Sequence, residues 1–206
     1  MTSDALYSYW FGDGSLDDPA YIGKRMSLWF GKSDRVDTEM REKFAPLLDS
    51  STSGTTSSGD SAVDAWPRSP RGLLTATLLF DQVPRNSFRG TARMFAYDLR
   101  ALTLCKQGIA QGLHQSLHIF EAMFLLLPLE HSEFLSDQDE SVFRFRELTA
   151  RAPPALKASI QGVEDFSLRH RAIVSRFGRF PHRNQILGRE SRPEEIEFLK
   201  TPGSGF

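Results

Sequence analysis

The sequence predicts an all-α protein of about eight or nine antiparallel helices joined by short loops. Apolar residues recur at helical spacing along most of the chain, capping residues and prolines divide it into segments, and no run of alternating β-branched residues indicates a strand. With 206 residues, of which 40% are apolar and 25% charged, the chain is typical of a folded globular protein, and we expect a single helical domain over residues 1–206.

The N-terminal part predicts two helices and a loop. The first starts at Asp17–Pro19, an acidic cap followed by a proline, and runs to Phe30 before a glycine. The second opens at Ser33 and carries an apolar stripe. Serine, threonine and glycine dominate residues 49–61, so we expect a flexible surface loop there.

Six further helices are expected after Pro70. The first, Arg71–Phe80, is so apolar that it should be buried, and Pro84 should end it. The others are expected from Thr91 to Gln107, from His114 to Leu127 before Pro128, from Leu129 to Ala150, from Pro153 to Ser175, and from a capping box at Ser191–Glu194 to Leu199.

Composition narrows the class of protein. A net charge of −1 disfavours a nucleic-acid-binding surface. No apolar run approaches the roughly 20 residues that cross a bilayer, and the N-terminus lacks the pattern of a signal peptide, so we expect no membrane association. A single cysteine, Cys105, fits a reducing compartment, so a cytoplasmic location is predicted.

A first polar cluster follows the most apolar helix. It contains Asp81, Gln82, Arg85, Asn86 and Arg89. A carboxylate at the end of a buried helix must be paired, because an isolated buried charge is costly. Asp81 therefore forms either a structural ion pair that fixes a turn or one wall of a site.

A second cluster surrounds His131, with Glu133 two residues later and Gln138 on the same helical face. A histidine beside a carboxylate can act as a general acid or base. His170 lies on an apolar helical face, where a histidine is more often a satisfied core residue than a catalyst.

A zinc site is not indicated, because His131 has no histidine four residues away. His114 and His118 have that spacing but no nearby carboxylate, so we interpret both as surface residues. No metal and no cofactor are predicted.

The most unusual segment is rich in arginine: seven arginines and one acidic residue lie between Arg169 and Arg192. Guanidinium groups bind carboxylates and phosphates in a bidentate manner, so this segment could hold an anion. It could equally pair with Asp81, Glu130 and Glu133 of the same chain. The candidate anion-binding residues here are Arg176, Arg179, His182, Arg183, Asn184 and Arg189.

Several motifs together resemble the bacterial family called domain of unknown function 924, over essentially the whole chain. They include Tyr9–Gly12, Leu79–Asn86, Pro128–Glu133 and the Arg-Phe-Gly-Arg-Phe-Pro-His-Arg-Asn block at 176–184. The resemblance implies an all-α, tetratricopeptide-like fold and implies no activity. The loop at 49–61 is longer than this connection usually is in the family.

We predict that these clusters meet in one pocket that binds a small anionic ligand, with acid–base catalysis by a histidine. A structural ion-pair network is the competing interpretation. A peptide- or protein-binding module is an alternative by fold analogy, and nucleic-acid binding, with Phe177 and Phe180 stacking on bases, is a second one. The predicted catalytic residues are Asp81, His131, Glu133 and His170, and the predicted ligand-binding residues are Arg85, Asn86, Gln138, Arg176, Arg179, His182, Arg183, Asn184 and Arg189.

Overall fold

The computed structural model describes residues 2–52 and 66–205, and in these ranges every regular element is a helix. The all-α prediction is confirmed, although the described ranges contain eleven α-helices instead of the eight or nine expected. The tetratricopeptide-like arrangement and the single domain stay predictions. The elements are α1 (Ser3–Phe11), α2 (Pro19–Phe30), α3 (Asp34–Lys43), α4 (Ala45–Thr52), η1 (Trp66–Arg68), α5 (Pro70–Ser87), η2 (Ala92–Phe95), α6 (Asp98–Ala110), α7 (Leu113–Ser116), α8 (Ile119–His131), α9 (Leu135–Arg151), α10 (Lys157–Phe177), η3 (Pro181–Arg183) and α11 (Pro193–Leu199).

The N-terminal helices begin where their capping residues predict. The Asp18 side chain accepts a hydrogen bond from the amide of Ala20 at the start of α2, and Ser33 accepts one from Val36 in α3. The predicted loop at 49–61 is wrong at its start, because residues 49–52 belong to α4. Its remainder, 53–61, lies outside the described residues.

Two prolines predicted to end helices lie inside them instead. Helix α5 continues through Pro84 to Ser87, and α8 continues through Pro128 to His131. A proline inside a helix costs roughly 3 kcal/mol, and here the surrounding turns are almost entirely buried, so packing offsets that cost. The corrected boundaries place Arg85 inside α5 rather than after it, and place His131 in the last turn of α8 rather than in the first turn of the next helix.

Other helix ends also differ from the prediction, because apolar periodicity locates a helix better than its ends. Glu195 accepts a hydrogen bond from the amide of Arg192 at 2.7 Å, so α11 is capped at Arg192 and not by Ser191 and Glu194. The segment after Thr91 is the short η2, and α6 starts only at Asp98. The expected helix from His114 divides into α7 and α8, α9 starts at Leu135 rather than Leu129, and α10 starts at Lys157 rather than Pro153.

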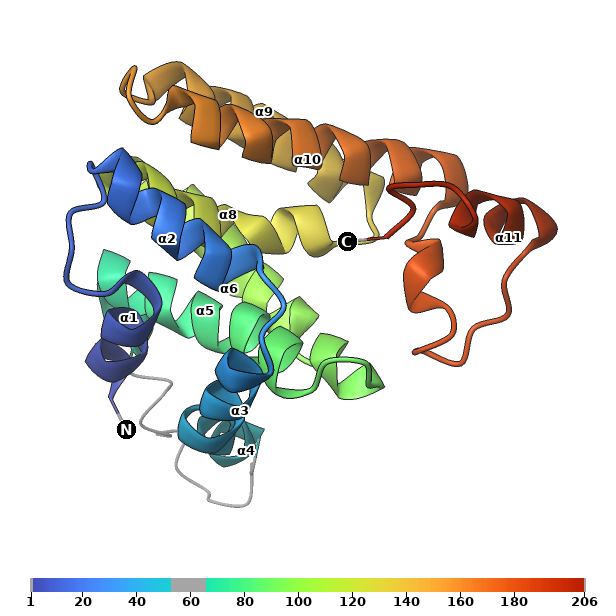
Figure 1. Cartoon of the computed structure of the whole chain (residues 1–206), viewed down its shortest axis with the longest axis horizontal. Coiled ribbons are helices and arrows are strands. Elements are labelled where there is room, and N and C mark those ends of the chain that lie inside the picture. The colour runs from blue at the N-terminus through green and yellow to red at the C-terminus, as the bar shows by residue number, and fades with distance from the viewer. Residues whose placement is uncertain (1, 53–65, 206) are drawn as a thin grey trace.

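Helices α5 and α8 form the centre of the main core. Residues Met123–Leu127 of α8 are at most 3% exposed, so the helix is enclosed on all sides. The α9–α10 hairpin covers one side of α8, and α1 and α3 pack against α5 (Figure 1). Edge-to-face aromatic contacts join Trp10 and Trp29 to Phe124.

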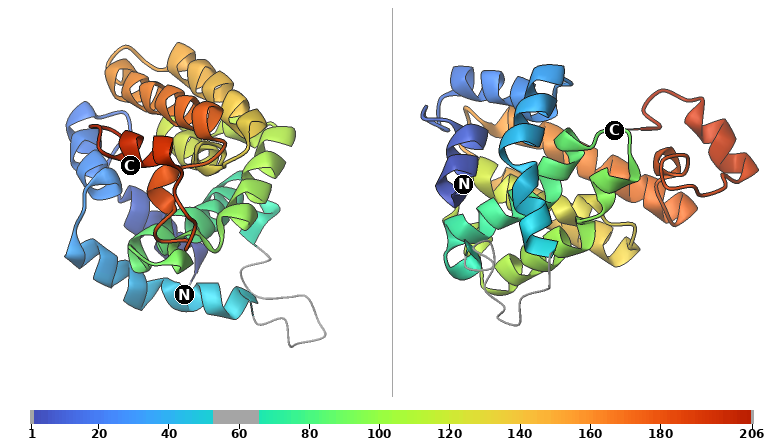
Figure 2. Two further views of the ribbon diagram at one scale, coloured as in Figure 1. Left: turned by 90° about the vertical axis from the view of Figure 1, so that its right-hand side faces the viewer. Right: turned by 90° about the horizontal axis from the view of Figure 1, so that it is seen from below.

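A second, smaller apolar cluster holds the C-terminal segment. It consists of Ile173, Val174, Phe177 and Phe180, with Phe198 of α11 packed against them. Figure 2 shows that helix α11, which this cluster holds, lies at the end of the molecule away from the N-terminus. Across the described ranges, none of the helices has both the length and the apolar character that crossing a bilayer requires.

Candidate functional site

A cleft of about 810 Å³ lies where five parts of the chain meet. Its walls come from the end of α2, the second half of α5 and the segment after it, the end of α8, one face of α10, and the C-terminal segment around η3. The volume is in the range of small-molecule sites. Residues from two of the predicted polar clusters and from the arginine-rich segment line the cleft: Gln82, Arg85, Asn86, Arg89, Glu130, His131, His170, His182 and Arg183.

Asp81 lies behind this wall and orients His131. The Asp81 carboxylate is fully buried, and its Oδ1 lies 2.8 Å from His131 Nδ1. Because a carboxylate can only accept, Nδ1 carries the hydrogen and Nε2 is the basic nitrogen. Burial opposes ionisation, but the charge of Arg85 and the bond from His131 hold the pKa of Asp81 well below its usual range. Burial, together with Arg85, lowers the pKa of His131.

Arg85 and Arg183 share one carboxylate, Asp98. Arg85 Nη1 donates to Asp98 at 2.8 Å and lies 3.2 Å from Asp81, while Arg183 Nη1 donates to Asp98 at 3.3 Å. Arg85 Nη2 and Arg183 Nε are buried without a hydrogen-bond partner. The Arg183 guanidinium lies between the rings of Phe95 and Phe180, 4.6 Å from each ring centre. Burial and the charge of Arg85 lower the pKa of Arg183 to about 10.

Three further titratable side chains in the cleft are held in their neutral forms. Burial, with the nearby charge of Asp81, raises the pKa of Glu130 to about 8. Burial lowers the pKa of His170 to about 3 and that of His182 to about 4. His170 Nδ1 donates to the carbonyl of Phe166 at 2.9 Å, and Glu130 Oε1 lies 3.2 Å from the same nitrogen.

Arg89 makes a structural contact at the edge of the cleft. It binds Asp37 through two hydrogen bonds of 2.7 and 2.9 Å and also donates to the side chain of Asn86. Asn86 in turn donates to the carbonyl of Gln82. Arg89 therefore supplies positive charge near the cleft but has its main partner in α3.

The other predicted site residues lie outside the cleft lining. Glu133 accepts two hydrogen bonds from Arg189 and one from the amide of Phe180. Arg179 makes a bidentate contact with the buried Glu195. These contacts hold the C-terminal segment against the connection between α8 and α9 and against α11. Three more predicted residues have structural roles. Gln138 donates to carbonyls at the end of α8, and Asn184 donates to Ser191 and Glu195. Arg176 lies over the rings of Phe177 and Phe198.

Sequence reasoning missed Asp98, the carboxylate that joins the two arginines. It follows Tyr97 at the start of α6 and looks like an ordinary acidic residue in a first turn. Phe95, which covers Arg183, and Lys32, which lines the cleft after α2, were missed as well. Asp98 belongs to one of the motifs that resemble the family, Phe95–Asp98, and a buried arginine needs a carboxylate partner, so these two signals together could have found it.

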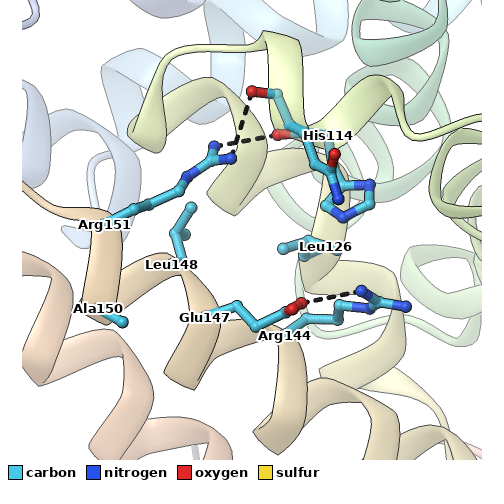
Figure 3. A pocket seen from close by; sticks show the side chains of 8 residues that line it. His114, Leu126, Arg144, Glu147, Leu148, Ala150 and Arg151 are labelled. Atoms are coloured by element: carbon cyan, nitrogen blue, oxygen red, sulfur yellow. Dashed lines mark hydrogen bonds and ion pairs between the residues drawn. The ribbon is translucent and has the colours of Figure 1, made fainter.

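A second cavity, of about 520 Å³, lies between α7 and α9 (Figure 3). Its arginines already have partners: Arg144 binds Glu140 and Glu147, and Arg151 donates to backbone carbonyls at the end of α7. His114 in its wall is buried, so the prediction of a surface histidine is wrong; His118, which is half-buried, caps α8. This cavity offers less unsatisfied hydrogen-bonding capacity than the cleft.

Within the described ranges, no three histidine, cysteine or acidic side chains come together as metal ligands. The class defined by fold and cleft is thus an all-α protein with a polar cavity whose wall contains an aspartate–histidine pair and two arginines.

The chain belongs to the family described as bacterial protein of unknown function (DUF924), which matches residues 6–203, and this confirms the resemblance seen in the sequence. A solved structure titled as a protein of unknown function from Agrobacterium tumefaciens is similar, with a TM-score of 0.75 and 29% identity over 96% of each chain. No functionally curated protein matches the chain.

Proposed function

We propose that the cleft binds a small anionic molecule and that His131 exchanges a proton with it. The observation that carries the proposal is the pair Arg85 and Arg183. Arg183 has as its carboxylate partner only Asp98, which Arg85 also uses; Arg85 pairs with Asp81 in addition, and each guanidinium group keeps a buried nitrogen without an acceptor. A buried donor without a partner costs about 1–3 kcal/mol, which a ligand oxygen between them would recover.

The charges around the cleft favour an anion over a cation. Four cationic side chains line it, namely Lys32, Arg85, Arg89 and Arg183. Three carboxylates, those of Asp37, Asp81 and Asp98, pair with the arginines. Because Glu130 keeps its proton near neutral pH, one positive charge remains. An anion would also relieve the repulsion between Arg85 and Arg183.

The Asp81–His131 pair supplies the acid–base chemistry. Asp81 holds the imidazole in one tautomer and stabilises its charged form, so Nε2 can accept a proton from a bound molecule or from water and return it later. Burial lowers the pKa of His131, so the ring is neutral near pH 7 and its Nε2 carries no proton. A cytoplasmic location is part of the proposal, supported by Cys105, which is a free and buried thiol.

The nucleic-acid alternative loses its structural basis, because Phe177 and Phe180 are 3% and 0% exposed and cannot stack on bases. A peptide in the same cleft is the other alternative. If the ligand is a peptide, the protein should bind peptides of several residues and should not bind small anions.

Binding is tested by thermal unfolding with sodium acetate, butyrate, octanoate, succinate, citrate or phosphate, each against sodium chloride of equal ionic strength. At least one anion should raise the Tm of the wild type, because a ligand stabilises the state that binds it. Arg183→Met should weaken that binding at least tenfold. Arg171→Met, which removes an arginine paired with Asp139 on the outer face of α10, should bind like the wild type. No stabilisation by any anion, or equal binding by Arg183→Met, would refute the proposal.

The basic nitrogen of His131 is tested by acylation with diethyl pyrocarbonate and mass spectrometry of the peptides. The reagent should modify His131, a bound anion should protect it, and Asp81→Asn should slow the reaction. His118, half-buried at the opposite end of α8 from His131, is the internal control and should show no protection. Failure to modify His131 under conditions that modify His118 would exclude it as an accessible base.

A further inference from the structure

The cleft has an apolar wall as well as a polar one. Met26, Trp29 and Phe30 at the end of α2 line it, together with Val163 and Phe166 of α10. Phe30 is 51% exposed and Phe166 is 46% exposed, although both are large aromatic residues. Exposed aromatics that gather around a cavity are typical of ligand contacts. Simple inorganic anions would leave this wall in water.

Helix α10 sets the direction from the apolar to the polar end. Its residues Ser159, Gly162, Val163, Phe166 and His170 all line the cleft, at the spacing of one helical face. Val163 and His170 are seven residues apart, so about 10 Å of helix separates the apolar part from the polar part. His170 lies at the end where Glu130 and the ring of Phe180 also lie, and Phe180 covers Arg183.

Space for a ligand chain exists at the apolar end. Gly162 has no atom within 4 Å of the position where a Cβ would be, and it lies in regular helix. Its neighbour on the same face, Ser159, is also small. Glycine inside a helix costs about 1 kcal/mol relative to alanine. A larger residue at position 162 would therefore stabilise the helix, but its side chain would occupy part of the cleft.

We infer that the ligand of this cleft is an amphipathic carboxylate, with its acidic head at Arg85 and Arg183 and an apolar chain or ring lying along α10 and the end of α2. This inference rests on the proposed anion-binding function and specifies its substrate class. The head would fill the hydrogen-bonding capacity of the two arginines, and the tail would cover Phe30 and Phe166. His131 would then contact the head or the atoms next to it.

The test is isothermal titration of the full-length protein with acetate, butyrate, hexanoate, octanoate and decanoate, all below their micelle concentrations. Affinity should rise about fourfold for each added methylene while the chain lies on the apolar wall. Octanol, which lacks the acidic head, should bind much more weakly than octanoate. Arg183→Met should weaken every member of the series by a similar factor.

Gly162→Leu tests the contact with the ligand's apolar tail separately from the contact with its acidic head. This variant should reduce octanoate and decanoate affinity at least tenfold and leave butyrate affinity unchanged. Gly23→Leu is the matched control, because Gly23 also lies inside a helix with open space around it but does not line the cleft. Unchanged octanoate binding by Gly162→Leu would overturn the inference.

The outcomes distinguish the two proposals. If affinity is independent of chain length while Arg183→Met still abolishes it, the amphipathic ligand is excluded and the anion site stands. If no carboxylate of the series and no other small anion binds the wild type, both proposals fail together with the site. Tighter binding of octanoate by Gly23→Leu than by the wild type would show non-specific association of the chain with added surface leucine and would also overturn the inference.

Discussion

Arginines that lie close together in the C-terminal segment differ in how completely carboxylates pair with them. Arg179 binds the carboxylate of Glu195 through two nitrogens, and Arg189 binds the carboxylate of Glu133 in the same way. Arg183, between them in sequence, has one hydrogen bond of 3.3 Å to a carboxylate that Arg85 already uses. The first two hold the C-terminal segment in place, and the third lines the cleft and shares its carboxylate with a second arginine.

Arginine content is therefore a poor guide to a binding site, and the number of acceptors per guanidinium group is a better one. Fully paired arginines contribute fixed structure. An arginine that shares its only carboxylate and keeps a buried donor retains the capacity to bind another oxygen. In this segment that criterion selects Arg183 alone.

Breaking a paired arginine should have the largest effect on stability. Glu133→Ala removes three hydrogen bonds, leaves the amide of Phe180 without an acceptor and leaves Arg189 with only the carbonyl of Phe180. We expect the free energy of unfolding to fall by about 2 kcal/mol, measured by urea denaturation. Glu140→Ala, which removes an exposed carboxylate while Arg144 keeps Glu147, should cost at most about 0.5 kcal/mol. Equal losses in the two variants would contradict the structural role of Glu133.

The cleft should show its own dependence on pH. Glu130 has a pKa raised to about 8 by burial, against an ordinary value of 4.5 in the unfolded chain. Between these values the folded protein keeps a proton that the unfolded chain releases. The stability that the neutral Glu130 provides is therefore complete below pH 4.5 and is lost as the pH rises towards 8, by at most about 1.4 kcal/mol per pH unit.

Glu130→Gln cannot ionise and isolates this contribution. The wild type should lose stability relative to the variant between pH 5 and pH 8, as measured by urea denaturation at each pH. Asp81 and His170, the charged and titratable neighbours of Glu130, are present in both proteins and cancel in the difference. Parallel stability curves for the two proteins would show that Glu130 is ionised in the folded state.

The sequence predicted the helical fold and several residues of the cleft, but not which candidate residues line the cleft and which make structural contacts. Apolar periodicity identifies buried helices, and the cost of an unpaired charge singles out Asp81. Neither signal shows that Glu133 turns towards Arg189 while His131 turns towards Asp81, because that depends on how α8 ends. Pro128 suggested an early end, and packing around α8 overrides it. Asp98 was not foreseen because its partners lie 13 and 85 residues away.

The smallest expected effect belongs to Arg176, which sharpens the contrast with Arg183. Its exposed guanidinium lies 4.6 Å from the ring centre of Phe177 and 5.7 Å from that of Phe198. Arg176→Ala should lower the Tm by only about 1–2 °C, because a solvent-exposed cation–π contact is weak. Anion binding should be unchanged, whereas Arg183→Met should lose it with little change in Tm, since Asp98 keeps Arg85 as its partner. A loss of binding in Arg176→Ala would show that net positive charge, rather than unsatisfied buried donors, attracts the ligand.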